Sequence, residues 1–187
     1  MIRRYKYALL ILLFLAQIHG ALGQQSLTVF VDKGFFRDGG RDLINTWLEQ
    51  LKRGYSCTVR YDSTGVFKGE GIYLTLTDRD RYRRAPVALR SRGLEACYIR
   101  STTNGVYITA NSMDGLQNAL YLFLEKLGFR YYFPEPAWHI IPIVKKFPVI
   151  NEVIEPSFAN RQLAMGWGHG NPEMAKRFSF WETANRM

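Results

Sequence analysis

The chain has 187 residues, of which 47% are hydrophobic and 22% charged, so it has the composition of a globular protein and the length for one ordinary domain. Its formal net charge of +9 at pH 7 favours acidic partners such as anionic polysaccharides or nucleic acids. The two cysteines and three histidines show no metal-ligand spacing, which argues against a zinc site, and no motif indicates a cofactor.

The first 23 residues have the order of a secretory signal peptide. Basic residues precede an apolar run over Ala8–Leu15, and small residues follow at Ala21–Gly23, before Gln24. An uncleaved membrane anchor is the alternative, but it needs about 20 apolar residues. We therefore expect secreted or periplasmic protein with no stable membrane insertion after cleavage. Removing the three basic residues lowers the net charge from +9 to +6. Because exported proteins rarely meet nucleic acid, an acidic glycan is the favoured partner.

Between residues 26 and 133 the pattern predicts five strands and two helices. Alternating apolar residues predict strands at Leu27–Val31, Cys57–Tyr61, Ile72–Thr77, Leu94–Arg100 and Val106–Ala110. Apolar residues at helical spacing predict helices over Asp42–Gly54 and Leu116–Leu127. Asn104 and Gly105 both tolerate positive φ and predict a hairpin between the last two strands. Two helices cannot cover both faces of such a sheet. We therefore expect an α+β fold, in which both helices lie on one face of a mixed sheet of about five strands and the other face needs a partner.

The segment Ser112–Pro134 is the most informative part of the chain. Ser112 can cap the second helix, and Gly128 can take the left-handed conformation after its last turn. The apolar face between these two residues must be buried. The helix then runs directly into an aromatic segment, Gly128–Pro134.

Asn118–Pro134 resembles the last helix and turn of a non-catalytic α/β domain in secreted bacterial glycoside hydrolases. This domain is domain 2 of β-N-acetylhexosaminidases and the N-terminal domain of α-glucuronidases, and it supports a catalytic (β/α)8 barrel. The resemblance covers roughly residues 26–161. It implies a supporting domain over residues 26–133, an extended Pro-rich connection over 134–155 and the start of a barrel over 156–187.

Only the start of a barrel fits after residue 156, because a (β/α)8 barrel typically needs about 250 residues. We therefore expect an N-terminal fragment whose last segment is poorly ordered without its barrel neighbours. Glycoside hydrolysis generally needs two placed carboxyl groups. The acidic residues here show no spacing typical of such a pair. The fragment itself is expected to be inactive, with the glycan substrate bound through the missing barrel.

Two residues of this last segment are candidates for substrate binding. The motif Pro156–Arg161 resembles the start of the first barrel strand in hexosaminidase-like enzymes, which implies that Arg161 donates hydrogen bonds to sugar hydroxyls. The following residues, Gln162–Gly166, depart from the family pattern, so a structural Arg161 paired with a carboxylate of the barrel stays open. Trp167, in a glycine-rich segment, is a candidate for stacking on a sugar, with an ordinary strand-to-helix loop as the alternative.

Cys57 and Cys97 both lie in predicted strands. An exported location allows a disulfide between them if those strands are neighbours, and two buried free thiols are the alternative.

An arginine-rich run allows a second functional hypothesis. It comprises Arg79, Arg81, Arg83, Arg84, Arg90 and Arg92. A solvated loop face is one interpretation, and an exported polysaccharide- or peptidoglycan-binding module is the other. A purely structural envelope protein is a third hypothesis.

Overall fold

The computed structural model describes residues 25–31, 40–55, 57–62, 69–80, 85–158, 161 and 170–187. Their elements in chain order are β1 (Gln25–Val31), α2 (Gly40–Gly54), β2 (Cys57–Asp62), β3 (Gly71–Leu76), α3 (Val87–Arg90), β4 (Cys97–Thr102), β5 (Gly105–Ala110), α4 (Met113–Lys126), β6 (Arg130–Tyr131), the short 3₁₀ helix η2 (Pro136–Trp138), β7 (His139–Ile140), β8 (Asn151–Ile154) and α5 (Pro172–Ala184). The predicted signal peptide lies outside the described residues. Within them, no helix is both long and apolar enough to cross a membrane.

The main sheet has six strands in the order β2-β1-β3-β5-β4-β8. The first four strands pair in parallel, whereas β4 pairs antiparallel with β5 and with β8. The predicted α+β fold class is therefore confirmed. The sheet has one strand more than the five expected, because β8 comes from the segment that the sequence indicated only as an extended connection.

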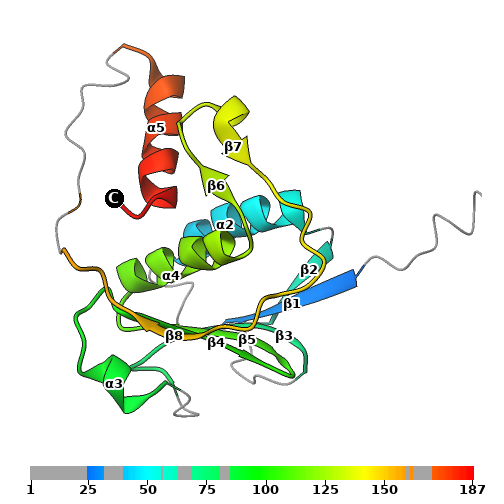
Figure 1. Cartoon of the computed structure of the whole chain (residues 1–187), viewed down its shortest axis with the longest axis vertical. Helices are drawn as coiled ribbons and strands as arrows, with labels where there is room; N and C mark the ends of the chain where they lie inside the picture. Colours follow the sequence, from blue (N-terminus) through cyan, green and yellow to red (C-terminus); the bar gives the residue numbers. More distant parts are fainter. Residues whose placement is uncertain are drawn as a thin grey trace, which may run out of the picture.

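Both long helices lie on the same face of this sheet (Figure 1). Trp47 of α2 is fully buried, and its indole nitrogen donates a hydrogen bond to the carbonyl of Leu120 in α4, at 3.0 Å. Beneath the helices lie the inward-facing side chains of the strands, including Val29, Leu74 and Ile108. This layer forms the main core.

The opposite face was expected to need a partner, but the chain itself covers part of it. A small cluster around α3 buries Leu89 against Tyr98 of β4, and α3 lies on the side of the sheet away from α2 and α4 (Figure 1). Further along this face, Phe30, Tyr73 and Tyr107 occupy one row of the register and stack, with ring centroids 4.7 and 4.3 Å apart.

Local sequence signals explain where α4 and the β4–β5 hairpin begin and end. The Ser112 hydroxyl accepts a hydrogen bond from the amide of Gly115 at 3.1 Å, and Gly128 has a φ of 101° after the last turn. The hairpin is confirmed, with one difference. Thr102 pairs with Gly105, so the loop is Thr103 and Asn104, and in this turn only Gly105 has a positive φ, 130°.

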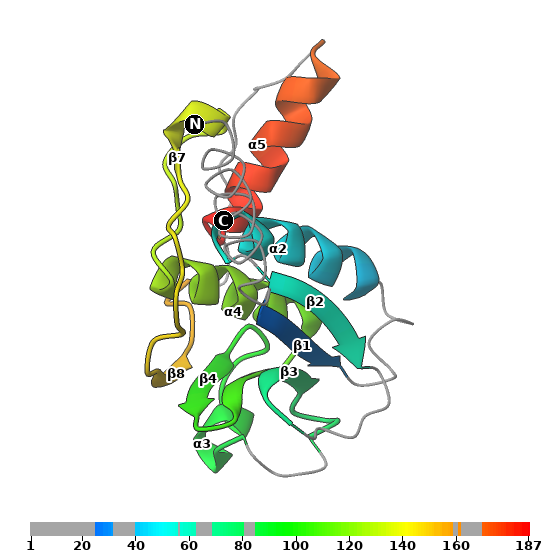
Figure 2. The ribbon, with the colours of Figure 1, turned by 90° about the vertical axis from the view of Figure 1, so that its right-hand side faces the viewer.

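The connection runs along the domain rather than away from it. The amide of Val144 donates to the carbonyl of Gly54 at 2.8 Å, and the Ser101 hydroxyl bonds both Pro148 and Ile150. These bonds fix the register in which β8 joins β4. Figure 2 shows the connection descending beside α4 to β8.

Candidate functional site

The segment after β8 meets the α/β domain at a cavity of about 390 Å³. Glu95, Cys97 and Asn118 line it from the domain, and Phe158, Arg161 and Arg186 line it from the C-terminal part of the chain. This cavity contains Arg161, the one described residue that the sequence singled out for substrate binding. Trp167, the other candidate, lies outside the described residues.

The Arg161 guanidinium is engaged with the protein. Its Nη2 donates to the carboxylate of Glu95, which also accepts a hydrogen bond from Asn118 Nδ2 at 2.9 Å. Its Nε donates to the carbonyl of Arg186 at 2.8 Å, and its Nη1 donates to the carbonyl of Phe158. Three of the five N–H groups that a guanidinium offers are therefore used within the chain. These contacts suit the alternative of a structural arginine, although its carboxylate partner belongs to the α/β domain.

The second carboxylate at this cavity is also held. Glu155 accepts hydrogen bonds from the amide of Gly93 at 2.7 Å and from Arg92 at 3.1 Å. The Gly93 amide first, and the Arg92 side chain second, lower the pKa of Glu155. Glu155 therefore stays ionised at neutral pH and is not poised to act as a proton donor.

Cys97 is a free, buried thiol. Burial raises its pKa to about 12, an effect that the Arg186 charge reduces, so it does not supply a thiolate nucleophile at neutral pH. The disulfide with Cys57 that the sequence left open does not form. Cys57 is on β2 and Cys97 on β4, and three strands lie between them, which is too far for a bridge when neighbouring strands are about 4.8 Å apart.

Residues 170–187 are anchored to the domain, which corrects the expectation of a poorly ordered segment for this part. Helix α5 begins at Pro172, because the Asn171 side chain caps it by accepting a hydrogen bond from the amide of Met174 at 3.1 Å. Near its other end, Trp181 Nε1 and Asn185 Nδ2 both donate to the carbonyl of Tyr131, each at 2.9 Å. The helix therefore lies beside the β6–β7 hairpin (Figure 1).

Ion pairs also connect the C-terminal part of the chain to the rest of the molecule. Among the described residues, each ion pair between distant parts of the sequence joins residues 152–186 to residues 92–135. These pairs are Arg92–Glu155, Lys126–Glu152, Arg161–Glu95, Arg177–Glu135 and Arg186–Glu125. No pattern in the sequence predicts these pairs, because ion pairing at such separations depends on the fold. We call these five pairs the ionic boundary.

The described arginines of the arginine-rich run also face carboxylates. Arg90 lies 4.0 Å from Asp80, Arg79 lies 3.9 Å from Asp78, and Arg92 belongs to the ionic boundary. Arg81, Arg83 and Arg84 lie outside the described residues. The described members therefore do not provide an unneutralised surface for an acidic glycan.

His139 is packed rather than poised as a base. Its ring lies edge-on to Tyr131, with centroids 5.0 Å apart, and its Nε2 is 3.0 Å from the carbonyl oxygen of Phe133. Burial is the main cause that lowers its pKa, so the ring is neutral at pH 7. The part of the chain that the structure describes contains no group of three or more side chains suited to hold a metal ion.

Neither the models of known protein families nor the sequences of curated proteins give a match to this chain. The resemblance to glycoside hydrolases therefore enters the functional argument as a proposal.

Proposed function

We propose that this chain is the non-catalytic supporting domain of an exported hydrolase that acts on O-glycosyl bonds. The single observation that carries the proposal is the ionic boundary. Two of its pairs, Arg161–Glu95 and Arg186–Glu125, join residues after 156 directly to the α/β domain. A third pair joins them to the connection, and the other two hold the connection on the domain. A domain that braces a following barrel needs to hold the first residues of that barrel in one position. Exposed ion pairs contribute little stability each, about 0–1 kcal/mol, but several together define an orientation.

The state of the acidic groups supports the same proposal. Glu95 and Glu155, the carboxylates at the cavity, are both bound to arginines. A glycosidase needs one carboxyl group that is protonated and another that is free to attack or to activate water. The described residues here are suited to holding the chain, and we place the chemistry in the barrel that the resemblance implies.

The test compares residues 24–187 with the complete protein that contains them. Both are purified and assayed against a panel of aryl glycosides and polysaccharides. We expect hydrolysis by the complete protein and none by residues 24–187. Hydrolysis by residues 24–187 alone would overturn the proposal, and so would a complete protein that is inactive on every O-glycosyl substrate while binding one of them.

The role of Arg161 has a separate test in the complete protein. If Arg161 braces the boundary, Arg161→Ala and Glu95→Gln lower the melting temperature by similar amounts and leave kcat/KM unchanged. Arg92→Ala, which removes another pair of the same boundary, is the matched control. Loss of activity in a fully stable Arg161→Ala protein, with Glu95→Gln active, assigns Arg161 to the sugar instead.

A further inference from the structure

Two cavities adjoin at the end of α2, away from the ionic boundary. One, of about 440 Å³, lies between the segment Lys145–Val149 of the connection and the β4–β5 turn. The other, of about 550 Å³, lies between the last turn of α2 and residues 143–145. Tyr55 and Lys145 line both of them, so the two cavities are neighbours, and we describe the pair as one depression. Their sizes are within the range of small-molecule sites, about 300–1,000 Å³.

Four cations surround this depression, namely Lys52, Arg53, Lys145 and Lys146. We call it the basic groove. None of the four forms an ion pair with a carboxylate of the described residues, and Arg53 bonds only the Gln50 amide oxygen, at 2.8 Å. This differs from the ionic boundary and from Arg79, Arg90 and Arg92, where each cation faces a carboxylate. The basic groove therefore brings together four cations that have no ion pair with a carboxylate of the described residues.

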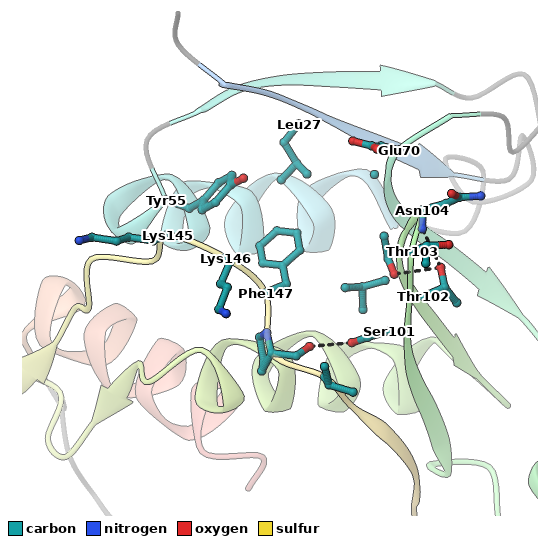
Figure 3. A pocket seen from close by; sticks show the side chains of 15 residues that line it. Leu27, Tyr55, Glu70, Ser101, Thr102, Thr103, Asn104, Lys145, Lys146 and Phe147 are labelled. Carbon is teal, nitrogen blue, oxygen red and sulfur yellow. Dashed lines mark hydrogen bonds between the residues drawn. The ribbon is translucent and has the colours of Figure 1, made fainter. Parts of the chain in front are cut away.

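The wall opposite the lysines is polar and uncharged except at one point. Figure 3 shows Lys145 and Lys146 on one side of the cavity of about 440 Å³, and Thr103, Asn104 and Glu70 on the other. Phe147 lies between the two sides and packs against Tyr55, with ring centroids 5.1 Å apart. The groove thus offers cations at one rim, hydrogen-bonding groups at the other, and an aromatic surface between them.

We propose that the basic groove binds an acidic polysaccharide, with its anionic groups on the four cations. A sugar chain matches the rest of the lining, because its hydroxyls donate to the Glu70 carboxylate and to the oxygens of Thr103 and Asn104. Its rings present C–H groups to the aromatic surface. Glu70 repels a purely anionic ligand such as a polyphosphate, but it accepts hydrogen bonds from a ligand that also carries hydroxyls. This site does not depend on the proposed supporting role.

Local structure explains the position of only two of the four cations in the basic groove. Lys52 and Arg53 lie in the last turn of α2, where positive charge is favourable to the helix dipole. Lys145 and Lys146 belong to no helix and come from a different part of the chain. Their arrival beside the same depression needs a further explanation, which an anionic ligand supplies.

The experiment measures binding of the full chain to four probes at physiological ionic strength by calorimetry. The probes are polygalacturonate, dextran sulfate, neutral dextran and vesicles that contain phosphatidylglycerol. The first two distinguish carboxylate from sulfate as the anionic group. We expect binding to one or both of them, no binding to neutral dextran, and weaker binding to vesicles.

The decisive variant is Lys145→Gln/Lys146→Gln. The matched control is Arg100→Gln/Lys176→Gln, because these two exposed cations lie on β4 and α5 and their replacement removes the same two positive charges. We expect the first variant to weaken polysaccharide binding about tenfold or more and the control to weaken it less than about twofold. Equal losses would mean a general charge effect and would overturn the site. Stronger binding to vesicles than to either acidic polysaccharide would assign the groove to a membrane surface and also overturn it.

Discussion

The α4 and α5 helices are similar in length but are held in different ways. Of the 14 residues of α4, eight are buried, most of them apolar and packed on the sheet or on α2. Of the 13 residues of α5, only Phe178 and Ala184 are buried. Partly buried Phe180 and Trp181 pack against the core, and the Arg177–Glu135 ion pair and the hydrogen bond from Trp181 to Tyr131 add polar attachments. Apolar burial is the main source of folding free energy, whereas exposed ion pairs add little. The comparison indicates a stable domain and a boundary that specifies position.

The largest effect is expected from replacing one tryptophan in the core of the domain and one in α5. Trp47→Ala removes a fully buried indole and its bond to α4, and we expect it to lower the free energy of unfolding by about 3–5 kcal/mol. Trp181→Ala is expected to release α5 while the sheet stays folded. Urea denaturation measures the first effect and amide exchange of α5 the second. Trp138→Ala, at 60% exposure, is the control. Equal global destabilisation by Trp47→Ala and Trp181→Ala would show that α5 belongs to the core.

Two glycines, Gly105 in β5 and Gly170 just before α5, allow the sheet and the C-terminal segment to be compared through their backbone. Gly105 has a φ of 130°, and a Cβ there would overlap the carbonyl oxygen of Gly71 in the neighbouring strand. We expect Gly105→Ala to cost more than about 2 kcal/mol, because it adds conformational strain to a steric clash. Gly170 also has a positive φ, 82°, but nothing lies within 4 Å of the added Cβ. Gly170→Ala should therefore cost about 1 kcal/mol. Thermal denaturation distinguishes the two, and similar costs would contradict the close approach of β3 and β5.

The coupling between Arg161 and Glu95 is expected to be smaller. Their side chains are 23% and 29% exposed, so a double-mutant cycle with Arg161→Ala and Glu95→Gln should give a coupling of about 1 kcal/mol. Added salt should reduce this coupling, because solvent reaches both groups. It should leave the cost of Trp47→Ala unchanged. A coupling near zero at low salt would remove this pair from the ionic boundary.

The smallest expected effect is a response to acid at one pair of the boundary. The pKa of Glu155 is lowered in the folded chain, so its contribution is present above the ordinary carboxyl pKa and is lost as pH falls through the lowered value. The protection of the Gly93 amide, which donates to Glu155, should therefore decrease in acid relative to the intrinsic exchange rate at each pH, before the sheet opens. Glu155→Gln is the control and should abolish this pH dependence. A pH response that survives in Glu155→Gln would assign the titration to another carboxyl group.

Elements whose signals are local could be predicted from the sequence. Ser112 marks the start of α4 and Gly128 marks its end, because a cap and a left-handed turn each depend on a few neighbouring atoms. Gly105 set the hairpin, although the positive φ falls on Gly105 alone and not on Asn104. The periodicity of the strands gave the α+β fold class, since the repeat of buried residues is itself written along the chain.

Contacts between distant residues became known only from the folded chain. The tertiary structure added β8 to the sheet, because pairing with β4 depends on backbone groups that any sequence carries. It separated Cys57 from Cys97 through the strand order, and it paired Arg161 with Glu95 of the α/β domain. It also brought Lys145 and Lys146 beside the end of α2. Spacing along a chain does not encode such contacts, because long-range pairs form only when a whole sheet has fixed the relative positions of its strands.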